Sequence, residues 1–144
     1  MSTKFAISVV DSSDVVADTT YYSFYEQVGD KTEYHAGDHS DLFVNRIIAT
    51  RRAPTKTKDS EGSRHSKLMV HRQVDVLNPE NVTVHKTNSI RTESSIAVGS
   101  DRLIVGRMIL ANAQALTGQD ISANMSDAEV AAMPGVDLMI DGAI

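Results

Sequence analysis

Apolar and polar residues alternate with the two-residue period of β-strands along the first two thirds of the chain. Turn clusters such as DSSD at 11–14 and GDHSD at 37–41 divide this part into segments. Six segments are predicted to be strands: 4–10, 15–25, 31–36, 42–52, 64–76 and 82–92. The first two predict an N-terminal hairpin and the third a short strand. The last three predict a meander of longer strands.

The three longer strands have two unlike faces, because side chains point alternately to the two sides of a sheet. Neither face of 42–52 is wholly apolar, so we expect one face to be covered and the other to meet a polar partner. In 64–76, Leu68 and Val70 lie on the face that suits a core. The opposite face holds His65, Lys67, Met69, His71 and Gln73. In 82–92 small hydroxyl residues lie opposite the valines, which also suits a polar ligand.

The period becomes helical after residue 100. Ser100 is the predicted N-cap of a helix over 101–116, whose apolar stripe is broad enough to indicate a covering partner, as in a dimer. The capping box at 126–129 predicts a short second helix, 127–133, which ends before Pro134. The apolar and acidic tail 134–144 is expected to dock on a neighbouring copy.

Strands followed by helices predict an α+β fold, with the helices gathered on one face of an antiparallel sheet. The length of 144 residues predicts a single domain over 1–144. Its expected parts are the hairpin and short strand at 1–36, the polar-faced sheet at 42–93, the helices at 100–133 and the tail at 134–144.

The net charge of −5 hides an uneven distribution. Residues 46–72 carry a balance of +6, which leaves −11 for the rest of the chain. A basic segment of this kind favours an anionic partner such as RNA. The alternative is that lysines and arginines at strand edges only keep the sheet soluble.

Several kinds of chemistry have no residues to support them. The absence of cysteine excludes disulfides and thiolate sites. The five histidines form no ligand pattern: a turn separates His35 from His39, and the other three suit the polar sheet face. Motifs of nucleotide-binding, hydrolytic or metalloprotease sites do not occur. We therefore expect no metal, no cofactor and no enzymatic activity, and likewise no membrane span or secretory signal.

The order of elements resembles the coat proteins of the single-stranded RNA bacteriophages, the levivirus group. The segment SSIAVGSDRLIVGRMILANAQAL at 94–116 is similar to the last strand and long helix of that family. The segments NRIIATRR at 45–52 and RHSKLMV at 64–70 resemble its pair of RNA-facing strands. The resemblance implies a dimer with a continuous ten-stranded sheet, covered by helices on one face. Such dimers would form an icosahedral virion, assembled in the bacterial host cytoplasm, that packages the viral single-stranded RNA genome on its inner sheet face. An RNA hairpin bound there would also make the protein a translational repressor.

The same resemblance implies a set of RNA-contacting residues on alternate positions of the three strands. They are Arg46, Ile48, Thr50 and Arg52, then His65, Lys67 and Met69, then His85, Thr87 and Ser89. A slip of one residue in the last strand would present Lys86, Asn88 and Ile90 instead. Arg51 is expected on the opposite face, whereas the loop 53–63 with Lys56 and Lys58 either reaches RNA or lies at the edge of the shell. An alternative function is that of a small dimeric α+β RNA-binding protein that does not form a shell.

Overall fold

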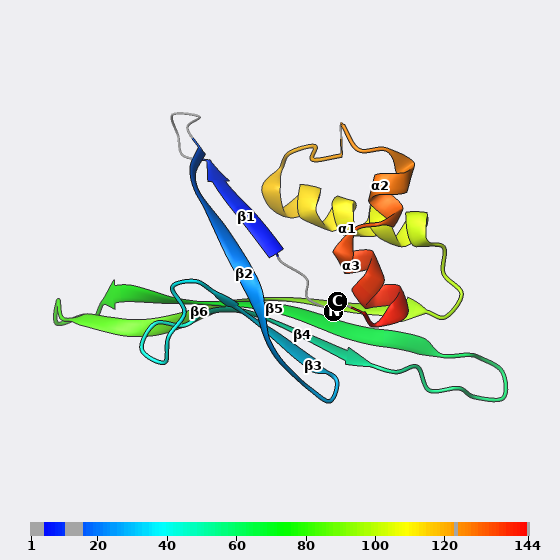
Figure 1. Ribbon diagram of the computed structural model, residues 1–144, viewed down its shortest axis with the longest axis horizontal. Helices are drawn as coiled ribbons and strands as arrows, with labels where there is room; N and C mark the ends of the chain where they lie inside the picture. The colour runs from blue at the N-terminus through cyan, green and yellow to red at the C-terminus, as the bar shows by residue number, and fades with distance from the viewer. Residues whose placement is uncertain (1–4, 11–15, 123, 144) are drawn as a thin grey trace. The chain divides into compact units, whose positions relative to one another are not determined.

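The protein is described here by a computed structural model, which covers residues 5–10, 16–122 and 124–143. The strands are β1 (Phe5–Val10), β2 (Val16–Val28), β3 (Lys31–Ala36), β4 (Asn45–Arg52), β5 (Ser63–Leu77) and β6 (Thr83–Ala97). The helices are α1 (Arg102–Thr117), α2 (Asp127–Ala131) and α3 (Pro134–Val136), followed by a π-helical turn, η1 (Asp137–Asp141). Strands followed by helices confirm the predicted α+β plan (Figure 1).

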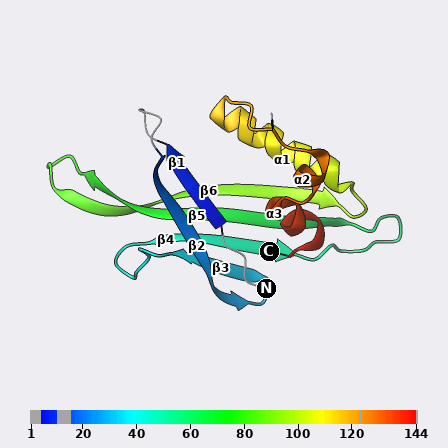
Figure 2. The same ribbon diagram turned by 45° about the horizontal axis from the view of Figure 1, so that its top comes forward.

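The six strands are hydrogen-bonded in their order along the chain, from β1 to β6. β1 pairs with β2 as the predicted N-terminal hairpin, and the predicted antiparallel sheet is confirmed, whereas the ten-stranded sheet of a dimer stays a prediction. β2 is longer than predicted because it pairs with β1 up to Tyr22 and with β3 from Tyr22 to Val28 (Figure 2). A bulge between Phe24 and Glu26 interrupts the pairing with β3. β6 extends to Ala97, beyond the predicted end at residue 92, because the strand continues through polar residues that no longer show the apolar alternation.

The register of β2 and β3 follows from a two-residue turn at Gly29 and Asp30, which places Val28 opposite Lys31. Gly29 has a φ of 58°, a conformation that glycine adopts without a steric penalty. β2 then pairs with β3, and β3 with β4, so that Tyr34 lies opposite Ile47 and His35 opposite Arg46. Because directly opposite residues share a face, this register fixes which side chains of the two strands lie together.

The chain divides into two compact units, where the sequence predicted a single domain. The first comprises Met1–Thr50 and Lys67–Thr92, and the second Arg51–Ser66 and Glu93–Ile144. β4, β5 and β6 each contribute residues to both units. In the first unit the core consists of Tyr22, Tyr34, Ala36 and Ile47, against which Leu68 and Val70 pack. The apolar face predicted for β5 is thus confirmed at Leu68 and Val70.

The second unit is built around α1. Asp101, and not the predicted Ser100, caps this helix: its carboxylate accepts hydrogen bonds from the backbone amides of Leu103 and Ile104, at 2.9 and 3.1 Å. Ser100 instead donates to the carbonyl of Ala97. The capping box of α2 is confirmed, with Ser126 and Glu129 each bonded to the other's backbone amide. The core of this unit contains Ile96, Val105 and Val136.

The C-terminal segment packs within its own chain. Pro134 begins α3 instead of ending the previous helix, since a proline at the first helical position lacks only an amide that has no partner there. Val136 and Leu138 are fully buried, and Met139 and Ile140 pack against the core of the second unit. Arg102 holds the segment through ion pairs with Asp137 and Asp141. The described residues of this segment therefore pack within their own chain, and docking on a neighbouring copy stays a prediction.

None of the helices in the described part of the chain has the length and apolar character needed to cross a membrane.

Candidate nucleic-acid interface

The first unit presents a polar sheet face built from alternate residues of its strands. In the register of β3 and β4, Arg46, Ile48 and Thr50 lie opposite His35, Glu33 and Lys31, respectively. On β5, Leu68 and Val70 point to the core, so Lys67 and Met69 point the other way. Arg46 Nε donates to His71 Nδ1 at 3.5 Å, which joins β4 to the polar face of β5. The structure therefore gathers these predicted residues on one face.

The position of β6 decides the one-residue alternative left open by the sequence. His85 contacts the carboxylate of Asp75. Asp75 lies on the same face of β5 as His71 and Met69, because an even number of positions separates them. Thr87 and Ser89 share that face with His85, whereas Lys86, Asn88 and Ile90 take the opposite one. The side chains of His85, Thr87 and Ser89 are exposed.

Exposure differs among the residues of this polar face. Lys67 is exposed and Arg46, Thr50 and Met69 are half-buried. Ile48 is only 4% exposed. It shares its face with the buried Glu33 and offers almost no surface to a partner, so the structure does not support direct RNA contact through Ile48.

Glu33 organises the centre of this face. Its carboxylate is bonded to Arg46 Nη1 at 2.8 Å, to His35 Nε2 at 2.9 Å and to Lys31 Nζ at 3.3 Å. Burial by itself would raise the pKa of Glu33, but the hydrogen bonds from His35, Arg46 and Lys31 outweigh it and lower the pKa to about 2. The carboxylate is therefore ionised at neutral pH and offsets much of the charge of Arg46.

Two histidines near Arg46 act as hydrogen-bond acceptors. His39 Nδ1 accepts from the backbone amide of Asn45 at 3.0 Å, and His71 Nδ1 accepts from Arg46. Burial lowers the pKa of His39, and His35 and Arg46 lower it further. Burial and then Arg46 lower the pKa of His71. Protonation at Nδ1 would remove either bond, so both histidines are suited to a neutral state.

The second unit holds the remaining predicted residues, Arg52 and His65. They line a shallow hollow of about 380 Å³ together with Ala53, Thr55, Ser63 and Ser95. No carboxylate is among these lining residues, and within the described residues Arg52 has no ion pair. A guanidinium, an imidazole and several hydroxyl groups in one hollow can bind a phosphate group and donate hydrogen bonds to its oxygens.

Other basic residues of the central segment lie elsewhere. Arg51 lies beside Gly142 and Arg64, and Arg64 Nε donates to the carbonyl of Ile140, so Arg51 lies against the C-terminal segment. In the loop 53–63, Lys56 forms an ion pair with Glu61 at 3.0 Å. The charge of Lys56 is thus offset locally, and its role in RNA contact stays a prediction.

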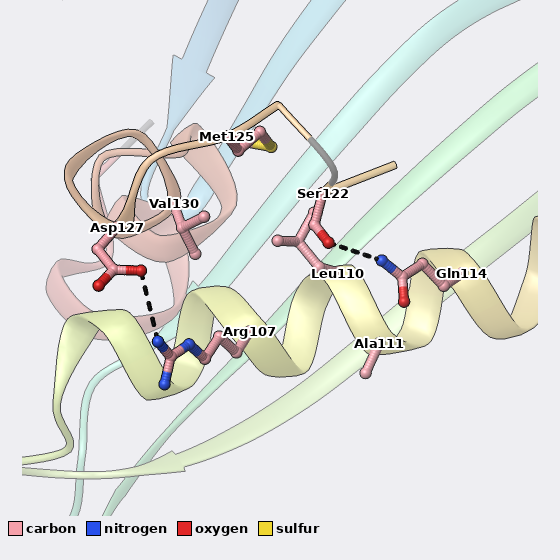
Figure 3. A pocket seen from close by; sticks show the side chains of 8 residues that line it. All are labelled: Arg107, Leu110, Ala111, Gln114, Ser122, Met125, Asp127 and Val130. Atoms are coloured by element: carbon pink, nitrogen blue, oxygen red, sulfur yellow. Dashed lines mark hydrogen bonds and ion pairs between the residues drawn. The ribbon is translucent and has the colours of Figure 1, made fainter. Parts of the chain in front are cut away.

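A further hollow, of about 230 Å³, lies beside α1 in the second unit (Figure 3). Its cation, Arg107, is bonded to Asp127 at 3.4 Å, and Gln114 donates to Ser122 Oγ at 3.2 Å. These bonds link α1 to α2 and to the segment between them, so the polar groups have a structural role. Among the described residues, no group of three or more histidines and acidic residues is placed to hold a metal ion.

Sequence reasoning missed part of the polar face of the first unit. Tyr25, Glu33, His35 and His39 come from β2, β3 and the following turn, to which the sequence assigned no RNA contact. The available signal was the alternation of Lys31, Glu33 and His35 in KTEYHA, a charged face opposite Thr32 and Tyr34. Without the register of β3 against β4, this signal could not be connected to Arg46.

Comparisons with solved structures agree on one fold for this chain. No family model and no curated protein matches the sequence. Among solved structures, the virus-like particle of Wenzhou levi-like virus 4 is similar with a TM-score of 0.61 at 20% identity, over 99% of this chain and 88% of that one. The virus-like particle of Beihai levi-like virus 32 matches with a TM-score of 0.58 at 18% identity, over 83% of each chain. The coat protein of bacteriophage EMS014 matches with a TM-score of 0.57 at 13% identity, over 99% and 97%. The chain therefore has the fold of levi-like phage coat proteins.

Proposed function

We propose that this chain is a structural coat protein that associates with copies of itself into a virion shell and packages single-stranded RNA. The observation that carries the proposal is the fold, which the chain shares over almost its whole length with proteins solved as virus-like particles. The proposed role is structural and not enzymatic. Its proposed setting is a phage virion that assembles in the cytoplasm of a bacterial host, around the viral genome.

Two features of the chain support self-association as a dimer. β6 is last in the strand order, so one edge of this 15-residue strand has no partner within the described chain. A long open edge of this kind readily pairs with another chain. On α1, Ile104, Met108 and Leu116 are exposed within roughly a third of the helix circumference. We propose that a second copy covers this stripe and pairs along β6, which would give the continuous sheet that the resemblance implies.

The polar sheet face supports RNA as the packaged partner. The proposed contacts are Arg46, Thr50, Lys67, Met69, His85, Thr87 and Ser89 in the first unit, and Arg52 with His65 in the second. Arginine and lysine neutralise phosphates and release counterions, which gives affinity for any RNA sequence. The hydroxyl groups and histidines can donate hydrogen bonds to phosphates and riboses. Binding of a specific RNA hairpin, and with it translational repression, is a separate proposal that a hairpin-affinity measurement tests.

Electron microscopy of the protein expressed alone in bacteria tests the proposal. Closed particles that protect RNA from nuclease are the expected result. Discrete dimers under all assembly conditions that still bind RNA would overturn the shell and leave a small RNA-binding protein. Particles without protected nucleic acid would overturn the RNA-packaging part instead.

A further inference from the structure

Three aromatic rings stack at the margin of the polar face of the first unit. The rings of Tyr25 and His35 lie 4.0 Å apart between centroids and are nearly parallel, at 14°. The ring of His39 lies 3.8 Å from His35 on a tilt of 37°. Because His35 contacts both other rings, Tyr25 and His39 form the two ends of the stack.

Hydrogen bonds fix this stack in place before any partner binds. His35 Nε2 is bonded to Glu33 Oε1 at 2.9 Å, and His39 Nδ1 accepts from the backbone amide of Asn45 at 3.0 Å. Tyr25, by contrast, is 58% exposed. The stack therefore presents a rigidly supported aromatic ring to solvent, and binding there would cost little conformational entropy.

The stack lies next to the cations of the same face. His35 stands directly opposite Arg46 in the register of β3 and β4. Arg46 and Lys31 are both bonded to Glu33, which is also the partner of His35. Glu33 is thus already neutralised by these cations, so it repels a nearby phosphate less than a free carboxylate would. The polar face therefore holds, side by side, rings on which a base can stack and cations that can bind a phosphate.

We propose that the Tyr25–His35–His39 stack is a binding site for an unpaired nucleobase, which lies on the ring of Tyr25 and extends the stack by one member. This inference rests on the proposed RNA-binding function and adds to it the recognition of single-stranded RNA. A base in a duplex has both faces covered by its neighbours, whereas an unpaired base can stack on an aromatic side chain. Since every base has a π-face, the site would tolerate any sequence but would require bases.

The test compares two ligands that carry the same phosphates. One is a 12-nucleotide oligoadenylate, and the other is an abasic ribose-phosphate oligomer of equal length. We expect Tyr25→Leu to weaken binding of unassembled protein to oligoadenylate roughly tenfold. The same variant should bind the abasic oligomer as the wild type does, and Tyr25→Phe should retain the affinity for oligoadenylate. Tyr21→Leu is a matched control, because Tyr21 is on the same strand and 57% exposed and should leave both affinities unchanged.

Tyrosine fluorescence gives an independent readout. The chain has four tyrosines and no tryptophan, so a base that stacks on Tyr25 should quench a measurable part of the emission. Oligoadenylate should quench the wild type and the Tyr21→Leu variant, but Tyr25→Leu should lose that component. The abasic oligomer should quench none of these proteins.

The possible failures can be told apart. A wild type that binds neither ligand would overturn the proposed RNA-binding function. Equal binding of oligoadenylate by the wild type and Tyr25→Leu would overturn the stacking site alone. A Tyr25→Leu variant that binds both ligands normally but fails to form particles would show that Tyr25 contacts another copy of the chain, which also overturns the stacking site.

Discussion

At the scale of single residues, the two arginines at the ends of β4 differ in their surroundings. Arg46 is bonded to Glu33 and His71, whereas Arg52 lies in a hollow without carboxylates. A phosphate that approaches Arg46 therefore meets a charge already offset by Glu33. Arg52 is the better probe of the proposed RNA contact, because substitution of Arg46 would also leave Glu33 without its closest cation.

Arg52→Ala is expected to reduce the salt dependence of RNA binding. Each phosphate contact with single-stranded nucleic acid adds about 0.7 to the slope of log K against log salt concentration, so the slope should fall by about that amount. The measurement is RNA affinity over a series of salt concentrations. Arg107→Ala is the control, since Arg107 of α1 is paired with Asp127 of α2 and should not alter the slope. An unchanged slope for Arg52→Ala would remove this hollow from the proposed interface.

Glu33→Gln is expected to destabilise the protein at neutral pH by on the order of 2 to 3 kcal/mol, because a buried, multiply bonded carboxylate is lost. The pKa of Glu33 falls from an ordinary value of 4.5 to about 2, so its contribution is complete above pH 4.5 and is lost as the pH falls toward 2. Urea unfolding over this range should therefore show a smaller pH dependence in the variant. Glu61→Gln, at the exposed ion pair with Lys56, should change the urea midpoint little. An equal pH dependence in Glu33→Gln and the wild type would contradict the role given to Glu33.

At the scale of secondary-structure elements, one glycine sets the distance between α1 and α2. A Cβ atom at Gly106 would lie 2.6 Å from the carbonyl oxygen of Val130 and 2.7 Å from its Cγ1. Alanine is the better helix former by about 1 kcal/mol. The contact with backbone is expected to outweigh this preference, since overpacking typically costs about 1–3 kcal/mol.

Gly106→Ala should therefore lower the melting temperature, although helix propensity alone predicts an increase. Thermal unfolding followed by circular dichroism measures the sign directly. Ala115→Gly, at an exposed position of α1, is the control. It should destabilise the protein only by the lower helix propensity of glycine, about 1 kcal/mol. A rise in melting temperature for Gly106→Ala would show that α2 can move away from α1 at little cost.

The open edge of β6 makes the proposed dimer testable with proline. Amide groups of successive residues in a strand point to opposite sides, so Asn88→Pro and Ser89→Pro remove one outward and one inward amide. One variant should keep the monomer fold and lose the dimer, and the other should destabilise the monomer itself. Light scattering and circular dichroism distinguish the two effects. Two folded, dimeric variants would exclude pairing along this part of β6.

At the scale of the whole molecule, self-association should appear as a stability that depends on protein concentration. Folding coupled to association shifts the unfolding midpoint upward as the concentration rises. Urea unfolding at several concentrations should show this shift for the wild type. Ile104→Lys with Met108→Lys should reduce it, because both side chains lie in the exposed stripe of α1. A midpoint independent of concentration would argue against an obligate dimer.

Much of the fold could be predicted from the sequence because its signals are local. The period of two identified six strands, the later helical period identified α1, and the capping box identified α2. Ends of elements were less accurate, since ladder pairing extends β6 and a proline at the first helical position begins α3. The division into two units could not be predicted, because it depends on which segments pack together.

The sequence by itself determined the α+β plan, the alternation of residues between the two faces of the strands and the concentration of positive charge in residues 46–72. Alternation and charge are properties of neighbours along the chain, so they can be read without coordinates. Only the tertiary structure decided that Ile48 is buried, that Glu33 offsets Arg46 and that Tyr25 stacks on His35. Each of these features depends on the register between strands, because a shift of one residue would move every side chain of a strand to the opposite face.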